Sequence, residues 1–365
     1  MRAFMIRYQT PVLLTFILAV IVAISDIGGL DSLQVALTEM LIRVLVVVGL
    51  YVFIGNSGVI SFGQTGFMCI GAYAVGWATA EPGFKQVMLQ GLPDILAQNQ
   101  WPFPVAMAGA IVLPAIVAFL FGLAILRLNG IAASIATFAF LIIVNSVYSN
   151  WDSVTAGVSS LVGIPTVVGP WVALGFAAAG IIVAYLFQVS RYGLMLRATR
   201  EDDVAAKACG IHSVRMRLVA FVLSAALVGA GGGLYAQFLG ILTVDTFYLS
   251  LSFITIAMLV VGGMGSLTGA VSGVILVTVI VQLLRYGEHG VMFGSTQLKM
   301  PESSSELGLG VLLALILIFR PNGVSGGKEL TLIGSSKGGP RETVSAAAGP
   351  TLQSDSNAVA SETTS

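Results

Sequence analysis

The longest charged stretch of the chain, residues 190–217, holds the side chains best placed to act on a partner. Three consecutive acids, Glu201 to Asp203, open a run of helix-forming residues, and Gly210 ends it. Acids at the start of such a run and glycine after its end are typical of a short helix. A partner that pushed on this helix would move the segments attached to it. The alternative is a plain solvated loop, and the residues alone do not decide between the two.

Polar residues within long apolar stretches form the second set of candidates. Ser61, Gln64 and Thr65 lie beside several glycines and could offer hydrogen bonds to a zwitterionic solute. A single buried amide or hydroxyl more often ties neighbouring helices together. The further candidates, to which both interpretations apply, are Asn145, Gln237 and Thr255.

No constellation for covalent chemistry accompanies these residues. A membrane-bound enzyme would need a cluster of His, Asp or Glu at one membrane face, and Glu201 to Asp203 have no nucleophile or metal-binding set nearby. Gly327-Lys328 lacks the following Ser or Thr and the earlier glycine-rich loop of a phosphate-binding motif. We therefore expect no catalytic residue, metal or cofactor, and an energy source on another chain.

Glu39 and Arg43 stand four residues apart on one face of a predicted span. We interpret them as a mutually neutralised pair rather than as a contact for a solute. An ion-coupled secondary transporter would use buried acids as proton or sodium sites. Because Glu39 is the one acid clearly inside a predicted span, that class is a weaker alternative.

Composition places these candidates in a membrane. Of 365 residues, 56% are hydrophobic and 9% are charged, against about 25% charged in soluble domains. So few charges could not cover a water-exposed surface, so most of the surface must face lipid. The formal net charge is zero and gives no sign of nucleic-acid binding.

A helix needs about 20 apolar residues to cross the hydrocarbon core. The chain is predicted to be an all-α polytopic membrane protein, with a transmembrane domain at 1–325 and a disordered cytoplasmic tail at 326–365, which is too poor in large apolar groups to fold. Span 248–264 ends in a glycine cluster and could be broken or re-entrant. The ten expected spans are 11–24, 33–54, 59–80, 104–126, 130–149, 171–189, 217–240, 248–264, 267–286 and 305–319.

Lys and Arg set the predicted orientation. With the N-terminus in the cytoplasm, eleven basic residues fall on cytoplasmic segments and three, Lys85, Arg285 and Lys299, on external ones. This bias predicts that both termini are cytoplasmic. The first segment could be mistaken for a signal peptide, but Ala23-Ile24-Ser25 is a poor cleavage site, and we favour a retained helix.

Two glycine stripes allow close approach of helices. Gly229 and Gly233 form one, and Gly265, Gly269 and Gly273 form the other. We favour packing within this chain over contact with a second, similar chain.

The charged stretch also carries a family resemblance. Ala205-Ala206-x-x-x-Gly210 resembles the cytoplasmic "EAA" loop of ABC importer permeases. The longer run that includes Arg191-Tyr192-Gly193, Arg197 to Asp202 and Ala220 to Ala225 is similar to the LivM-type branched-chain amino acid permeases. The general loop has Glu before the two alanines, where this chain has Val204. Further matching segments are Gly55 to Tyr73, Arg127 to Gly130, Thr155 to Gly157, Gly163 to Pro165, Gly262 to Ser266 and Phe319 to Gly323.

The resemblance implies a coupling helix that docks in a cleft of a cytoplasmic ATPase. It also implies a second permease subunit (LivH-like), a periplasmic solute-binding protein, and a bacterial inner-membrane location. The solute is a branched-chain amino acid, or else urea, a short amide or another small polar molecule. The residues to which it assigns ATPase coupling are Arg200, Glu201, Asp202, Asp203, Ala205, Ala206 and Gly210.

Overall fold

The computed structural model describes residues 9–27, 31–128, 130–288, 291–293, 296–298, 308, 310, 319–320, 323–327 and 329. The chain divides into two compact units, Met1–Leu330 and Thr331–Ser365. Glu329 falls in the first of these units, and the domain boundary after residue 325 stays a prediction. The predicted tail from 331 onward and most of the predicted span 305–319 lie outside the described residues.

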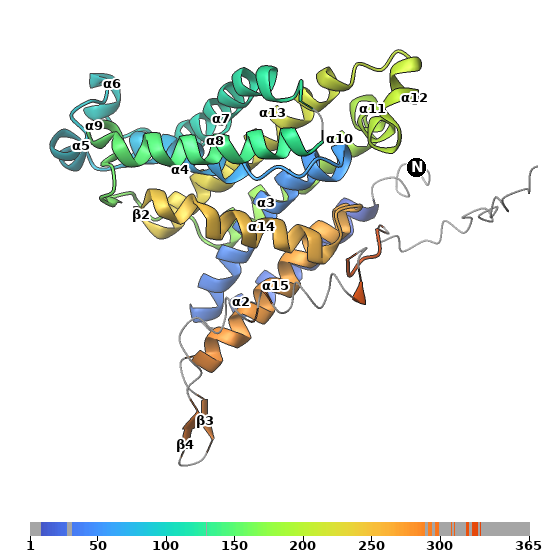
Figure 1. The fold of residues 1–365 in the computed structure, drawn as a ribbon. Helices are drawn as coiled ribbons and strands as arrows, with labels where there is room; N and C mark the ends of the chain where they lie inside the picture. The colour runs from blue at the N-terminus through green and yellow to red at the C-terminus, as the bar shows by residue number, and fades with distance from the viewer. Residues whose placement is uncertain are drawn as a thin grey trace, which may run out of the picture. The chain divides into compact units, whose positions relative to one another are not determined.

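Helices make up most of the described chain (Figure 1). The long helices are α2 (Gln9–Ile27), α3 (Asp31–Ser57), α4 (Gln64–Thr79), α7 (Phe103–Ile125), α8 (Ile131–Asn150), α10 (Pro170–Val189), α13 (Ser213–Leu239), α14 (Leu249–Gly262) and α15 (Leu267–Glu288). The shorter elements are α5 (Pro82–Met88), α6 (Asp94–Ala97), α9 (Asp152–Thr155), α11 (Arg191–Glu201), α12 (Asp203–Ala208), the 3₁₀ turn η1 (Val244–Phe247), and strands β1 (Leu161–Val162), β2 (Ile241–Leu242), β3 (Val291–Phe293) and β4 (Thr296–Leu298). The all-α prediction is confirmed.

Eight helices of the described residues are long and apolar enough to cross a membrane. They match eight of the ten predicted spans, and α4 occupies the position of a ninth. With residues 305–319 largely outside the described part, the total of ten stays a prediction.

The predicted span 59–80 is wrong at its start. Gly58 adopts φ +72°, a left-handed conformation that suits glycine, and the helix resumes only at Gln64. The 16 residues of α4 extend about 24 Å, which is less than the hydrocarbon thickness of about 30 Å. Residues 58–63 therefore interrupt the helical structure between α3 and α4.

Helix α13 forms the centre of the packing, in contact with α3, α4 and α7. Almost every residue of α4 is buried, as is α3 from Met40 to Ile54 except for Arg43. Such burial on all sides explains why these two helices are apolar around their whole circumference.

Glycines allow α4 and α13 to touch along their backbones. A Cβ on Gly71 would overlap the carbonyl oxygen of Gly229, and one on Gly232 would overlap that of Met68. The two predicted glycine stripes likewise pack inside the chain. Gly229 faces Ala110 and Pro114 of α7, and Gly273 of α15 faces Met258 and Gly262 of α14. The interpretation as packing within the chain is confirmed for these residues.

The segment between α4 and α7 is built around one buried cation. The Nζ of Lys85 donates hydrogen bonds to the backbone carbonyls of Ala78 (3.3 Å), Leu96 (3.0 Å) and Asn99 (2.9 Å). Burial lowers the pKa of Lys85 from its ordinary value. Through these three carbonyl acceptors, Lys85 holds the end of α4 close to the C-terminal end of α6.

The backbone contact between α4 and α13 gives the first prediction. A Gly71→Ala substitution should destabilise the protein by about 1–3 kcal/mol or more, because the added methyl meets rigid backbone rather than a movable side chain. Its apparent melting temperature in mild detergent should fall clearly below that of the unaltered protein. The matched control is Gly109→Ala in α7, where a Cβ would meet nothing within 4 Å. Equal melting temperatures for the two variants would contradict this account of the packing.

Candidate coupling segment and translocation path

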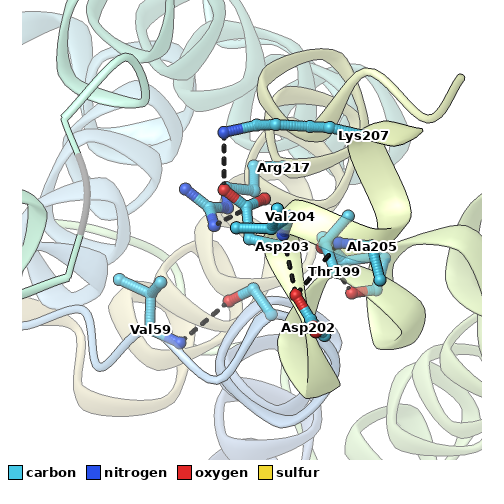
Figure 2. Close-up of polar contacts among 10 residues, drawn as sticks. Val59, Thr199, Asp202, Asp203, Val204, Ala205, Lys207 and Arg217 are labelled. Carbon is cyan, nitrogen blue, oxygen red and sulfur yellow. Dashed lines mark hydrogen bonds and ion pairs between the residues drawn. The ribbon is translucent and has the colours of Figure 1, made fainter. Parts of the chain in front are cut away.

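Both ends of α12 are capped by residues of the predicted coupling motif. Asp202 adopts an extended conformation, and its carboxylate accepts hydrogen bonds from the backbone N–H groups of Val204 (2.8 Å) and Ala205 (3.0 Å). These are two of the amides that a helix start leaves without partners. The dashed lines from Asp202 in Figure 2 mark both bonds.

At the other end, Gly210 closes a Schellman motif. Gly210 has φ +81°, its N–H donates to Lys207 O (2.9 Å), and the N–H of Ile211 donates to Ala206 O (3.0 Å). That pattern satisfies the last carbonyls of a helix and favours glycine in the left-handed position. The spacing Ala206-x-x-x-Gly210 thus has a direct backbone reason.

Helix α12 is held against α13 by charges. Asp203 pairs with Lys207 (2.7 Å) and with Arg217 (3.8 Å) of α13, and Figure 2 shows Lys207 and Arg217 converging on its carboxylate. The hydrogen bond from Lys207, aided by the two positive charges, holds the pKa of Asp203 below its ordinary range. Asp203 therefore stays ionised at neutral pH and keeps α12 attached.

Helix α11 links this segment to two membrane helices. The Nη2 of Arg197 donates to Gln188 O near the end of α10 (2.6 Å), and the Nη1 of Arg200 donates to Gly55 O near the end of α3 (2.6 Å). A guanidinium at the C-terminal end of a helix also suits the helix dipole. A displacement of α11 would therefore pull on α3 and α10 directly.

In the charged segment 190–217, the structure adds a second helix to the one short helix that the sequence predicted. The segment holds two helices, α11 and α12, which meet at Asp202 with φ −152° and ψ 108°. The acid that caps the second helix must leave helical geometry to do so. Residues 213–217, also predicted as loop, are the first turn of α13.

The outer side of this pair is open. Glu201, Asp202, Ala205 and Gly210 are exposed, and Val204 is 79% exposed. Ala206 is buried. An exposed valine next to small residues offers a partner a shallow apolar contact.

A second polar region lies where α4 and α14 begin. Thr65 in the first turn of α4 and Ser252 in the first turn of α14 share a hydrogen bond. The interruption before α4 is fastened on both sides, because Phe62 N donates to the hydroxyl of Thr137 (3.4 Å) and Ser252 Oγ donates to Phe62 O (3.4 Å). Thr255 follows one turn after Ser252.

Several buried polar atoms here have no partner within the described chain. Ser61 Oγ and both amide atoms of Gln64 are unpaired, and their residues are at most 1% exposed. Because an orphaned polar group in an apolar interior is costly, these atoms are suited to a polar molecule or water. Asn145 lies on α8, and its buried Nδ2 is also unpaired. The described hydrogen bonds bring Thr65 and Ser252 together but do not include Asn145.

Comparison with known proteins identifies the family. Residues 32–319 match the model for the branched-chain amino acid transport system / permease component. The chain belongs to this family.

Individual relatives agree with the assignment. The chain is 27% identical over 322 residues to the high-affinity branched-chain amino acid transport system permease protein LivM of Salmonella typhimurium and to that of Escherichia coli, with 79% of this chain and 68% of each relative covered. It is 31% identical over 158 residues to the corresponding LivH protein of Salmonella typhimurium, which covers 43% of this chain and 46% of that protein. No solved structure gives a significant match. The resemblance predicted from the motifs is confirmed.

The pair Glu39 and Arg43 of this permease behaves as predicted. The Nη2 of Arg43 forms an ion pair with Glu39 Oε1 on the same helix. The charge inside the predicted span is neutralised locally, as the spacing of four residues allows.

Sequence reasoning missed three residues of these regions. Ser252 stands in a run of apolar residues without any marker of its partner Thr65, which is 187 positions away. Gln188 sits at the end of an apolar span, and Glu329 sits in what reads as a polar tail. The sequence signal available for all three was a polar side chain next to a predicted helix end.

The cap of α12 gives the second prediction. Asp202→Ala should cost the helix about 1 kcal/mol and speed hydrogen exchange of the amides of Val204 and Ala205, measured by mass spectrometry on peptides that cover 203–210. Asp202→Ser, which keeps an acceptor oxygen, should restore most of the protection. The control is Glu201→Ala, an exposed acid on the adjacent residue. Equal exchange in the Asp202→Ala and Glu201→Ala variants would rule out the cap.

Proposed function

We propose that this chain is the transmembrane permease subunit of an ATP-binding-cassette importer that moves branched-chain amino acids inward by alternating access. The observation that carries the proposal is the family match over residues 32–319. Both LivM relatives are named as permease proteins of high-affinity branched-chain amino acid transport systems. ATP hydrolysis takes place on a partner chain, and the permease uses it mechanically.

The coupling pair α11 and α12 receives that motion. Its exposed residues, among them Glu201, Val204 and Ala205, contact the cytoplasmic ATPase. Asp202 and Gly210 keep α12 rigid through its caps. The anchors from Asp203 to α13 and from Arg200 to α3 pass the displacement to membrane helices. Arg200 thus acts through its bond to Gly55 of the same chain, and Ala206 is buried rather than part of the docking surface.

The solute passes the point where α4 and α14 begin. Helix N-termini carry a partial positive charge, and interrupted helices at membrane depth present such ends to anionic groups in other transporters. Two helix starts meet here through Thr65 and Ser252. The carboxylate of an amino acid fits this polarity, and Ser61 and Gln64 supply hydrogen bonds that the protein itself leaves unused. Thr255 extends the same path along α14.

The complete importer contains further chains. The similarity to LivH over 158 residues supports a second, LivH-like permease beside this one. A periplasmic solute-binding protein delivers the amino acid at the outer face, and cytoplasmic ATPase subunits bind at the inner face. The chain lies in the bacterial inner membrane with both termini in the cytoplasm, as the distribution of Lys and Arg predicts.

Uptake by the purified importer gives the third prediction. Tagged protein extracted in mild detergent should carry an ATPase and a second permease with it. In proteoliposomes that contain ATP and receive the loaded binding protein, labelled leucine, isoleucine or valine should accumulate. Accumulation should need ATP and persist when ionophores collapse the ion gradients.

Three other results would redirect the assignment. Accumulation of urea or a short amide without leucine would identify a different solute for the same machinery. Uptake that ionophores abolish would indicate ion coupling. Purification without any ATPase, combined with ATP-independent uptake, would reject the importer.

The proposed path gives the fourth prediction. Gln64→Leu should reduce leucine uptake at least fivefold, the lower end of a coupling of 1–3 kcal/mol, because the solute loses its buried amide partner. The apparent melting temperature should stay the same or rise, since an unpaired buried amide is replaced by an apolar group of similar size. Gln98→Leu, the same exchange at an exposed loop residue, is the control. Unchanged uptake in Gln64→Leu would remove this residue from the path.

A further inference from the structure

The junction between α14 and α15 is a short turn that joins two predicted spans. Helix α14 ends at Gly262 and α15 begins at Leu267, so carbonyls at one end and N–H groups at the other lack helical partners. Within a membrane protein these groups must be satisfied by the chain itself. The residues that satisfy them come from far along the sequence.

Residues 323–327 and Glu329, here called the strap, include the groups that bind the end of α14. The N–H of Val324 donates to Val261 O (2.9 Å), and the N–H of Ser325 donates to Gly262 O (3.1 Å). The hydroxyl of Ser325 also bonds to Gly262 O (2.9 Å). The strap thus takes over the carbonyls that α14 leaves free.

The same strap caps the start of α15 with a carboxylate. Glu329 accepts hydrogen bonds from the N–H of Leu267 (2.9 Å), the N–H of Thr268 (3.1 Å) and the hydroxyl of Thr268 (2.7 Å). Both carboxylate oxygens are used. A negative charge at a helix N-terminus is favourable, and its hydrogen bonds are of the strong, charge-assisted kind.

A fourth bond to Glu329 comes from α10. The Nε2 of Gln188 donates to Glu329 Oε1 (3.2 Å), and the backbone carbonyl of Gln188 accepts from Arg197 of α11 (2.6 Å). The coupling helix α11 is therefore connected through one residue of α10 to the carboxylate that holds α15. In parallel, Arg200 of α11 binds Gly55 of α3, and a Cβ on Gly55 would lie 2.9 Å from Met264 O in the same junction.

We infer that Glu329 is a positioning residue for transport, which transmits movement of α11 through Gln188 to the α14–α15 junction. This inference rests on the proposed function and names a part of its mechanism. Displacement of Arg197 pulls on the end of α10. Gln188 passes the displacement to the Glu329 carboxylate, and α15 follows because its first two amides are bound to that carboxylate. Helix α14, which bears Ser252 and Thr255 of the proposed path, is bound to the same strap.

Coupling and simple structural support predict different results for Glu329→Gln. In the reconstituted importer, leucine taken up per ATP hydrolysed should fall about fivefold or more, the scale of a lost coupling energy, while ATP hydrolysis continues. Asp26→Asn removes one exposed carboxylate elsewhere and should leave this ratio unchanged. A variant that melts earlier and loses uptake and hydrolysis in the same proportion would show support alone and overturn the inference. An unchanged ratio would also overturn it.

A second variant tests the route. Gln188→Leu removes the donor to Glu329 and should lower the ratio in the same way. The double variant should be no worse than Glu329→Gln alone, because both changes break one connection. Additive losses would mean that Glu329 and Gln188 act separately. The unaltered importer is assayed beside them, so a wild-type complex without ATP-driven leucine uptake would count against the proposed function rather than against this route.

Discussion

A helix end leaves backbone N–H and C=O groups without helical partners, and the need to pair these groups organises much of the polar chemistry of the protein. At two such places, hydrogen-bonding groups from distant parts of the chain supply the partners. Phe62, in the break before α4, bonds to Thr137 of α8 and Ser252 of α14. At the turn between α14 and α15, Ser325 donates a hydrogen bond to Gly262 O, and Glu329 accepts one from the N–H of Leu267. Helix ends are thus the places where hydrogen bonds connect separate helices.

Those connections also join the short helices α11 and α12 to the long helices of the protein. The pair α11 and α12 contacts α3, α10 and α13 through Arg200, Arg197 and Asp203. Each of these side chains is charged, and each binds a helix end or a partner charge. The apolar helices between the two faces are packed backbone to backbone through glycines such as Gly71. Helices packed this closely deform little, so a displacement of one helix is passed on to its neighbour.

Local features of the fold were predictable from the sequence, and long-range ones were not. The start and end of α12 follow from Asp202 and Gly210, because a cap acts within a few residues of itself. The late start of α4 at Gln64 was missed, since residues 59–63 look like part of one apolar run and hydropathy does not register a backbone turn at Gly58.

The same distinction holds for the candidate site. Thr65 and Gln64 stood out in the sequence as polar residues beside glycines. Ser252 becomes a candidate only through its hydrogen bond to Thr65, which is 187 positions away. Glu329 reads as part of a solvated tail until its four bonds to α15 and α10 are seen. Periodicity and motifs carry no information about such pairings.

The double capping of α12 has a consequence for how fast and how tightly a motor protein can engage it. A loop that folds only on contact spends part of its interaction energy on losing conformational entropy. Six residues closed by Asp202 and Gly210 have already lost that freedom, so encounter requires no folding step. In the proposed importer, α12 would then present the same shape to the ATPase in every cycle. The nucleotide bound to the ATPase alone would decide when its binding to α12 becomes tighter or weaker.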